Sequence, residues 1–201
     1  SFIYNFIDES RFNVFNKKDF TSRKQILIVG NLDIAGKQID HVLTAFSQIA
    51  EEKRRGWTIK VIGDGHTKPV LVKIAERLRI LNCVNFVGKK SNPVADFFES
   101  DFYVLSSSLE GFPLTLLECI FSNLPIISYE CAPSIKEIVI DKVNGLIVAR
   151  NDISALSDAM LYLITNPDVL KEMSENQTPL KQKFNSQIIL KQWEQLLSMG
   201  S

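Results

Sequence analysis

Residues 104–129 read VLSSSLEGFPLTLLECIFSNLPIISY, an apolar stretch interrupted by one short polar loop. The apolar run Phe102–Leu105 predicts a buried strand, and a serine-rich loop follows it. The compact apolar segment Leu114–Phe121 predicts a helix that ends at Asn123-Leu124-Pro125, after which Ile126 opens another strand. Strand, loop, helix and strand in this order form the repeating unit of a parallel sheet.

Two carboxylates stand out in this stretch, because Glu110 and Glu118 are its only charged side chains. Glu110 lies in the loop at the carboxyl end of a predicted strand, where open α/β sheets bind ligands. Pro113 suits the first helical position, and Glu118 then shares one helix face with Leu114 and Leu117. Because helical side chains lean toward the N-terminus, we expect Glu118 to reach toward the same crevice as Glu110.

The start of the predicted helix adds a second kind of group to this crevice. Its free backbone N–H groups and partial positive charge suit a phosphate. Carboxylates, in turn, accept hydrogen bonds from hydroxyl groups. A ligand that carries both hydroxyls and phosphates, such as a nucleotide sugar, would use all of these groups. The alternative is that Glu110 only stabilises the helix start and that Glu118 pairs with a buried cation.

The spacing Glu110-x7-Glu118 within EGFPLTLLE resembles the signature of the retaining glycosyltransferases of the group-1 family. The resemblance extends over nearly the whole chain and is to the C-terminal, donor-binding half of their GT-B fold. It implies an α/β fold: a single Rossmann-like, doubly wound domain with a mainly parallel sheet of about six strands. We therefore expect residues 1–24 to be a linker leading into the domain and residues 25–201 to form the nucleotide-sugar-binding domain. We also expect an N-terminal half of the same protein to be missing from this chain.

Strand-like segments alternate with helical ones along the rest of the chain, which also predicts a parallel, doubly wound sheet. Besides the elements named above, we expect strands at residues 26–30, 57–62, 83–87 and 146–149, and helices at 39–54, 70–81, 93–100, 134–140, 153–165, 167–176 and 186–197. We expect the apolar face of the last helix to be partly exposed, because in this fold the terminal helix often crosses to the other domain.

The segment GNLDIAGKQ, residues 30–38, comes close to a phosphate-binding P-loop but departs from it. Five residues rather than four separate its two glycines, and Gln38 stands where a P-loop has Ser or Thr. A Walker-type nucleotidase therefore does not fit. The resemblance implies instead that Lys37 contacts the donor diphosphate and stabilises the leaving group, while Asn31 stands where the family usually has an arginine. Without the family, the segment indicates only a solvated loop lysine at Lys37.

Glycines follow the second and the third predicted strand. Gly63-Asp64-Gly65 is a weak match to the dinucleotide-binding fingerprint, because the third glycine is absent, and by itself it indicates a tight turn between strand and helix. The resemblance implies that Gly63 lets the donor approach closely. It also implies that the loop containing Gly88 and Lys89 lies near the nucleotide base.

The resemblance gives each candidate residue a role. Lys37 and Glu110 are the catalytic candidates, with Lys37 neutralising the diphosphate and Glu110 holding the sugar hydroxyls. The donor-binding candidates are Glu118 for the ribose hydroxyls, the backbone of Gly111, Phe112, Pro113 and Leu114 for sugar and phosphate, and Asn31, Gly63, Gly88 and Lys89 for the rest of the nucleotide. No D-x-D motif or His/Cys cluster indicates a metal, so we expect no cofactor beside the substrate.

Charge and apolar composition exclude several classes of protein. Lys plus Arg and Asp plus Glu both number 23, and this zero net charge gives no support to nucleic-acid binding. No apolar run approaches the roughly 18 residues of a membrane span, and no signal peptide is visible. Cys83, Cys119 and Cys131 form no C-x-x-C motif and indicate reduced thiols of a cytoplasmic protein. Peripheral association with the inner face of the membrane is an expectation from the family alone.

The resemblance implies a retaining glycosyltransferase that moves a sugar from a nucleotide-diphosphate sugar to a glycan or lipid-linked acceptor, in polysaccharide or glycoconjugate synthesis. We expect the isolated domain to be inactive. A nucleotide-sugar epimerase of the same fold is one alternative, but it needs acids and bases around the sugar ring, and only Glu110 is available. A nucleotide-binding module without catalysis is another, because of Asn31. A serine hydrolase does not fit, since no G-x-S-x-G motif occurs.

Overall fold

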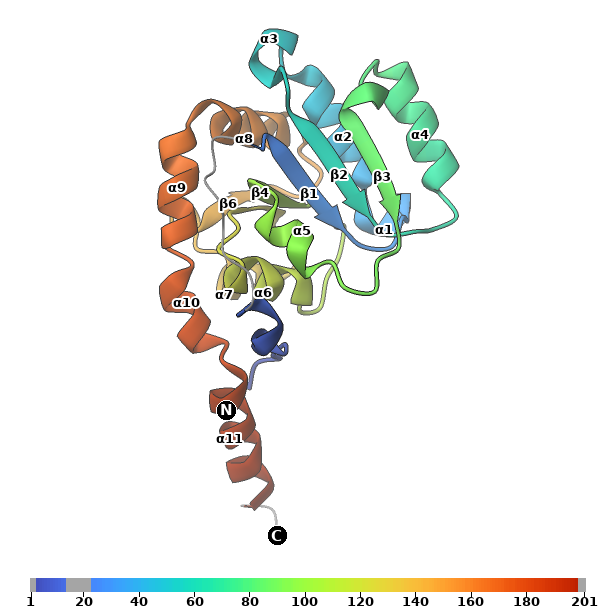
Figure 1. Ribbon diagram of the computed structural model, residues 1–201. Coiled ribbons are helices and arrows are strands. Elements are labelled where there is room, and N and C mark those ends of the chain that lie inside the picture. The colour runs from blue at the N-terminus through green and yellow to red at the C-terminus, as the bar shows by residue number, and fades with distance from the viewer. Residues whose placement is uncertain (1–2, 14–22, 199–201) are drawn as a thin grey trace.

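The computed structural model describes residues 3–13 and 23–198 (Figure 1). Its centre is a six-stranded sheet in the order β3-β2-β1-β4-β5-β6, in which every neighbouring pair is parallel. The strands are β1 (Gln25–Val29), β2 (Thr58–Ile62), β3 (Val84–Gly88), β4 (Phe102–Leu105), β5 (Ile126–Tyr129) and β6 (Gly145–Val148). The order reverses between β1 and β4, so their carboxyl ends form the switch point at which such sheets bind ligands. The expected Rossmann-like parallel sheet is confirmed.

Helices cover both faces of this sheet. The helical segments of the described chain are η1 (Glu9–Phe12), α1 (Ile34–Lys37), α2 (Ile39–Gln48), α3 (Glu51–Arg54), α4 (Lys68–Arg77), η3 (Leu81–Cys83), α5 (Val94–Phe98), α6 (Leu114–Phe121), α7 (Pro133–Ile138), α8 (Ile153–Thr165), α9 (Pro167–Glu175), α10 (Thr178–Lys183) and α11 (Ser186–Ser198). Helix α2 contacts α4 and α8, whereas α6 contacts α5, α10 and η1 (Figure 1). These two groups form the two helical layers of a doubly wound fold.

The core is densest along β4 and β5. Every residue of both strands is buried, which is what strands covered by helices on both faces require. The prediction that residues 1–24 lead into the domain falls partly outside the described residues. Within them, Phe12 is buried, and its ring lies 6.2 Å from that of Phe98 and 6.1 Å from that of Phe121.

The predicted helix over residues 39–54 is wrong at its centre. Helix α2 ends at Gln48, Ile49 and Ala50 adopt ψ angles of 128° and 136°, and the separate turn α3 follows. Ile49 stays buried at the break, so the apolar pattern continues and hides it. The carbonyl of Ile49 accepts a hydrogen bond from Arg54 Nε at 3.1 Å. Two short helices, α1 and α10, were also not expected, since both lie in segments without an apolar period.

The two ends of the described chain are fastened together. Glu9 Oε1 accepts hydrogen bonds from Asn185 Nδ2 at 3.0 Å and from the backbone N–H and the hydroxyl of Ser186 at 3.1 and 2.8 Å. Residues 176 and 177 positions apart in the sequence are thereby joined at the start of α11. We call these hydrogen bonds of Glu9 with Asn185 and Ser186 the clasp. Beyond the clasp, α11 projects away from the rest of the domain (Figure 1).

The apolar face of α11 is largely uncovered, as expected. Within the described part of this helix, Ile189 is its one buried residue. The exposed apolar side chains are Ile188, Leu190, Trp193, Leu196 and Leu197. None of the helices within the described ranges is long and apolar enough to cross a membrane.

Candidate donor site at the carboxyl edge of the sheet

The loops after β1 and β2 meet so closely that only glycine fits between them. Gly63 has a φ of +146°, and a Cβ atom added to it would lie 1.8 Å from the carbonyl oxygen of Gly30. A Cβ atom at Gly65 would lie 2.4 Å from the carbonyl oxygen of Leu32. The turn therefore requires these glycines with or without a ligand, which agrees with their interpretation as a tight turn.

Beside these loops lies a pocket of about 380 Å³, within the range of small-molecule sites. It is lined by Val29, Gly30, Asn31, Ile62, Gly63, Asp64, Lys89, Lys90 and Pro93. The pocket thus brings together three of the predicted donor-binding residues, Asn31, Gly63 and Lys89, from three different loops. Gly88, with a φ of +87°, ends β3 immediately before Lys89.

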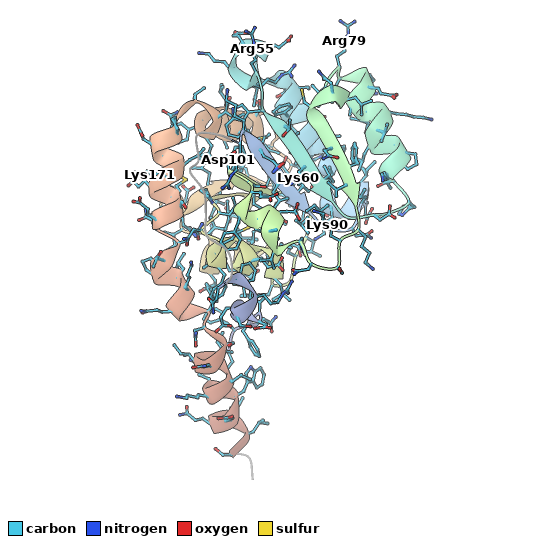
Figure 2. All side chains as sticks on the ribbon, viewed as in Figure 1. Arg55, Lys60, Arg79, Lys90, Asp101 and Lys171 are labelled. Atoms are coloured by element: carbon cyan, nitrogen blue, oxygen red, sulfur yellow. The ribbon has the colours of Figure 1, made fainter. Side chains whose placement is uncertain are left out.

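The two lysines of this pocket differ in their partners. Lys90 Nζ lies 2.8 Å from both carboxylate oxygens of Asp96, a buried residue that Lys60 also contacts at 3.0 Å (Figure 2). Lys90 is therefore held by a charge of its own protein. Within the described ranges, Lys89 has no ion pair or hydrogen bond through its side chain. Its charge is available to a ligand in the pocket.

Lys37 lies at the end of the short helix α1, where the loop after β1 turns toward α2. Asp33 begins this helix by accepting a hydrogen bond from the backbone N–H of Ala35 at 3.1 Å, and Gln38 ends it in the left-handed region at a φ of 48°. The Lys37 side chain crosses Gly30, where an added Cβ atom would lie 3.4 Å from its Cε atom. Position 30 therefore leaves room for the lysine.

The ammonium of Lys37 meets the carboxylate of Glu110. The distance between Lys37 Nζ and Glu110 Oε1 is 2.5 Å, and the two side chains are 32% and 14% exposed. The structure thus joins the two catalytic candidates, which are 73 positions apart in the sequence. The alternative of a solvated, unpaired loop lysine at position 37 does not describe this geometry.

The serine-rich loop before Glu110 fastens this pair to α1. Ser106 Oγ donates a hydrogen bond to the carbonyl of Lys37 at 2.7 Å, and the backbone N–H of Ser108 donates to the carbonyl of Gly36 at 2.8 Å. Ser107 Oγ donates to Glu110 Oε1 at 2.6 Å. These serines were not among the predicted site residues. The available signal was a run of small polar residues directly after a buried strand.

Two further side chains border the Glu110 loop on the side of β6. Arg150 Nη1 donates a hydrogen bond to the carbonyl of Ser108 at 3.2 Å. Burial, and after it the charge of Glu110, raise the pKa of Cys131 to about 11 against the opposing effect of Lys37. Cys131 therefore remains a protonated thiol and is no nucleophile at neutral pH.

The start of α6 differs slightly from the prediction. Pro113 precedes the helix as its N-cap residue, with a ψ of 105°, rather than occupying its first turn. The carbonyl of Gly111 accepts a hydrogen bond from Ser134 Oγ at 2.6 Å. Within residues 3–13 and 23–198, the backbone N–H groups of Gly111, Phe112 and Leu114 have no acceptor. Three donors are therefore available in the loop where a phosphate was expected.

Glu118 lies on the next turn of α6, and its carboxylate has no hydrogen bond or ion pair among the described residues. Burial raises its pKa above the ordinary value of 4.5, and the charge of Arg11 partly opposes this. Arg11 comes from the N-terminal segment and donates a hydrogen bond from Nη2 to Asn92 Oδ1 at 2.9 Å. The approach of this arginine was not predicted from the sequence. No ion pair of Glu118 with a cation occurs within the described ranges, although the charge of Arg11 acts on its carboxylate, so the alternative of a buried cationic partner stays open.

Tyr103 is fully buried in β4, the strand that leads into the Glu110 loop. Its hydroxyl donates to the carbonyl of Val29 at 3.2 Å, and burial raises its pKa far above the usual range. The charges of Cys119, Glu118 and Glu110 raise this pKa further. That the two glutamates face a common crevice stays a prediction.

Phe112 packs the site loop against both ends of the described chain. Its ring centre lies 6.1 Å from that of Tyr4 and 6.3 Å from that of Phe184. The Tyr4 hydroxyl donates to Glu137 Oε2 at 2.8 Å, and Lys183 Nζ lies 3.2 Å from the same oxygen. These two hydrogen bonds lower the pKa of Glu137, whose role is thus structural.

Two other features of the described residues bear on ligand binding. A larger cavity, of about 1030 Å³, lies between the N-terminal segment and helices α10 and α11, and it holds none of the predicted site residues. Across the described ranges, no group of three or more His, Cys, Asp or Glu side chains could hold a metal ion. That the protein works without a metal stays a prediction.

Comparison with known families gives one match over most of the chain. The family model described as glycosyl transferases group 1 matches residues 10–178. An uncharacterised glycosyltransferase of Haemophilus influenzae is 31% identical over 183 residues, which cover 90% of this chain and 51% of that protein. The chain therefore spans about half the length of this relative.

Two solved structures share the fold. A mutant of S. aureus TarM in complex with fondaparinux, alpha-GlcNAc-glycerol and UDP gives a TM-score of 0.85 at 21% identity, over 96% of this chain and 38% of that one. Anabaena HepE in complex with UDP-glucose gives a TM-score of 0.83 at 19% identity, over 98% and 57%. At these identities the likeness extends to the fold alone.

Proposed function

The chain belongs to the group 1 glycosyl transferases, and on that premise we propose that it is the donor-binding half of a retaining enzyme that uses a nucleotide-diphosphate sugar. The enzyme would transfer the sugar to a glycan or lipid-linked acceptor in polysaccharide or glycoconjugate synthesis. The observation that carries the proposal is the contact between Lys37 and Glu110 at the switch point of the sheet, beside the free N–H groups of the α6 loop.

The leaving diphosphate needs positive charge and hydrogen-bond donors. Lys37, at the end of α1, supplies the charge. The backbone N–H groups of Gly111, Phe112 and Leu114, in the loop that leads into α6, supply the donors. Donors fixed before the reaction stabilise charge that develops in the transition state without reorganisation, and one such donor is worth about 3–4 kcal/mol. In this proposal Lys37 and the loop do the work that a metal does in other transferases.

The carboxylates would bind the sugar parts of the donor. Glu110 would accept hydrogen bonds from hydroxyls of the transferred sugar, and Glu118 from the ribose. The raised pKa of Glu118 supports this role, because an unpartnered carboxylate gains most when hydroxyl donors reach it. Each charge-assisted hydrogen bond contributes about 1.5–3 kcal/mol.

The pocket after β1, β2 and β3 would take the nucleotide base and the adjoining phosphate. Its backbone is fixed by glycine contacts, and Lys89 brings a charge without a partner in the described protein. Asn31 lacks the positive charge that the family usually has there, so Lys89 would supply the second cation of the donor site. The UDP in the TarM complex and the UDP-glucose in the HepE complex make uridine the first base to test.

Acceptor binding would belong to the other half of the protein. The chain spans 51% of the relative from Haemophilus influenzae, and α11 presents an uncovered apolar face that a second domain could bury. We therefore propose that the chain by itself binds a donor weakly and transfers little or no sugar. An epimerase would need a second acid or base on the sugar, and the one beside Glu110 in the described site is Lys37, which this proposal assigns to the diphosphate.

The first test is binding of UDP, GDP and ADP to this chain, followed by ligand-observed NMR. We expect one nucleotide to bind and Glu118→Ala to weaken it at least tenfold. Glu172→Ala, an exposed glutamate on α9, is the matched control and should bind like the wild type. Failure of all three nucleotides to bind, or equal binding by Glu118→Ala, would contradict the donor site.

The second test separates a transferase from a module without catalysis. Donor hydrolysis or transfer is measured in the full-length protein, with and without Glu110→Ala. A transferase loses its rate in the variant, whereas a module without catalysis shows no rate in either form. Rapid transfer by the isolated 201-residue chain would contradict the assignment of the acceptor site to the missing half.

A further inference from the structure

One carboxylate oxygen of Glu110 serves two partners at once. Glu110 Oε1 accepts hydrogen bonds from Lys37 Nζ at 2.5 Å and from Ser107 Oγ at 2.6 Å. The second oxygen, Oε2, has no partner within the described ranges. The carboxylate is therefore held from one side only, and its other oxygen is left for a ligand.

The two partners differ in how freely they can leave. Lys37 has a long side chain, and 32% of it is exposed. Ser107 is completely buried, with a short side chain on a loop that its neighbours Ser106 and Ser108 fasten to α1. Lys37 can turn toward a ligand, whereas Ser107 cannot follow it.

The proposed function asks Lys37 to bind the diphosphate and Glu110 to bind the sugar. In the structure these two side chains neutralise each other instead. A dianionic diphosphate near Lys37 competes with Glu110 for the ammonium, so donor binding exchanges one charge pair for another. After the exchange, the bond from Ser107 is the remaining side-chain contact of the carboxylate within the described protein.

We propose that Ser107 is the positioning residue that keeps Glu110 in place for the sugar when the diphosphate takes Lys37. This inference rests on the proposed function. Ser107 contacts neither sugar nor phosphate in this scheme. It acts through Glu110, so its effect falls on the part of the binding affinity that the sugar adds, not on the part that the diphosphate provides.

The test compares two probes, UDP and UDP-glucose, by titration calorimetry on the 201-residue chain. GDP with GDP-mannose and ADP with ADP-glucose are run in parallel. For the pair that binds, the wild type should bind the nucleotide sugar more tightly than the diphosphate. Ser107→Ala should lower this affinity ratio by at least about 10-fold, the value of one hydrogen bond to a charged group, and leave diphosphate binding within about twofold.

Two control variants separate the loss of the Ser107 hydrogen bond from a general weakening of the loop. Ser107→Thr keeps the hydroxyl and should retain the wild-type ratio even if its added methyl group lowers the melting temperature. Ser106→Ala removes a hydrogen bond of the same loop to the carbonyl of Lys37, so it should change both affinities by the same factor and leave the ratio unchanged.

The outcomes separate the inference from the function it rests on. An unchanged ratio in Ser107→Ala, or an equal loss for both probes, shows that Ser107 only stabilises the loop and overturns the inference alone. A wild type that binds a diphosphate without any gain from the sugar overturns the inference together with the assignment of Glu110 to the sugar, and leaves the diphosphate site standing. If the wild type binds none of the six probes, the donor site itself is wrong and the inference falls with it.

Discussion

The two sides of the carboxyl edge are built by different means. On the β4 side, side chains hold the site: Lys37, Glu110 and the serine loop are linked by hydrogen bonds of 2.5–2.8 Å. On the β2–β3 side, the backbone holds it, because glycines let neighbouring loops touch and few side chains are fastened. Side-chain networks fix charges in place, whereas a backbone wall tolerates changes in what lines it. On the β4 side, Ser107 thus holds Glu110 in place, whereas the β2–β3 side leaves the lining of its pocket open to variation.

Removal of Lys37 should have the largest effect, because it removes the ion pair with Glu110 on the β4 side, where side chains hold the site. Lys37→Met deprives the diphosphate of its cation and leaves Glu110 to repel it. We expect the transfer rate of the full-length protein to fall about 100- to 1000-fold, and diphosphate affinity to fall with it. Lys171→Met, an exposed lysine on α9 (Figure 2), is the control and should behave like the wild type. A Lys37→Met enzyme with more than a tenth of the wild-type rate would assign the leaving-group charge elsewhere.

A substitution at Gly63 tests whether close backbone contacts hold the β2–β3 side of the edge. Gly63→Ala places a Cβ atom against the carbonyl of Gly30 at a φ of +146°, so we expect the free energy of unfolding to fall by about 2–3 kcal/mol. Gly111→Ala, on the other side of the edge, meets no atom within 4 Å and should cost less than about 0.5 kcal/mol. Urea unfolding of both variants measures the difference. Equal costs would mean that glycine contacts do not distinguish the two sides.

Glu110→Gln tests the side-chain network in the opposite direction, because it should raise the affinity for the bare nucleoside diphosphate instead of lowering it. The amide can still accept from Ser107, but it no longer competes for Lys37. Binding of the bare nucleoside diphosphate should therefore become about 2- to 5-fold tighter, while the gain from the sugar falls. Calorimetry with UDP and UDP-glucose measures both. Glu130→Gln, whose partner is Lys136 at 2.6 Å, is the control, and weaker UDP binding by Glu110→Gln would argue against the exchange of partners.

The smallest expected effect concerns the pH dependence of stability at Glu118. Burial raises its pKa in the folded state, so the folded protein binds the proton more tightly than the unfolded chain does. This contribution is fully present below the unfolded pKa and is lost as the pH rises through the folded pKa. At pH 7 the free energy of unfolding of Glu118→Gln, measured by urea unfolding, should therefore be higher than that of the wild type by up to about 1 kcal/mol. At a pH below about 4 the variant and the wild type should be equally stable. A variant that is less stable at pH 7 would show that Glu118 gains more from Arg11 than it loses by burial.

Strong local patterns were predicted well. Strand β4 and helix α6 occupy the predicted ranges Phe102–Leu105 and Leu114–Phe121, since an unbroken apolar run and a helical period leave little choice. The break after Gln48 was missed because the buried Ile49 continues the apolar period across it. Sequence pattern describes which side chains are buried, not whether the backbone between them stays helical.

The candidate site was predicted residue by residue but not in its contacts. The charge pattern of residues 104–129 singled out Glu110 and Glu118, and the resemblance added Lys37, yet their roles in this chain stay predictions. The hydrogen bond from Ser107 to Glu110 and the effect of the Arg11 charge on Glu118 were not predicted from the sequence. Arg11 comes from a segment more than a hundred residues from α6, and only the folded chain brings the two together.

The clasp between Glu9 and the start of α11 also determines how the domain would bear a pulling force. Because it joins residues 176 and 177 positions apart, tension applied to the two ends loads these hydrogen bonds before it reaches the sheet. The strands of the parallel sheet would be sheared only after the clasp has opened. The entering and leaving segments would thus yield before the sheet does, and because Tyr4 of the entering segment packs on Phe112, their release would remove a contact of the Glu110 loop.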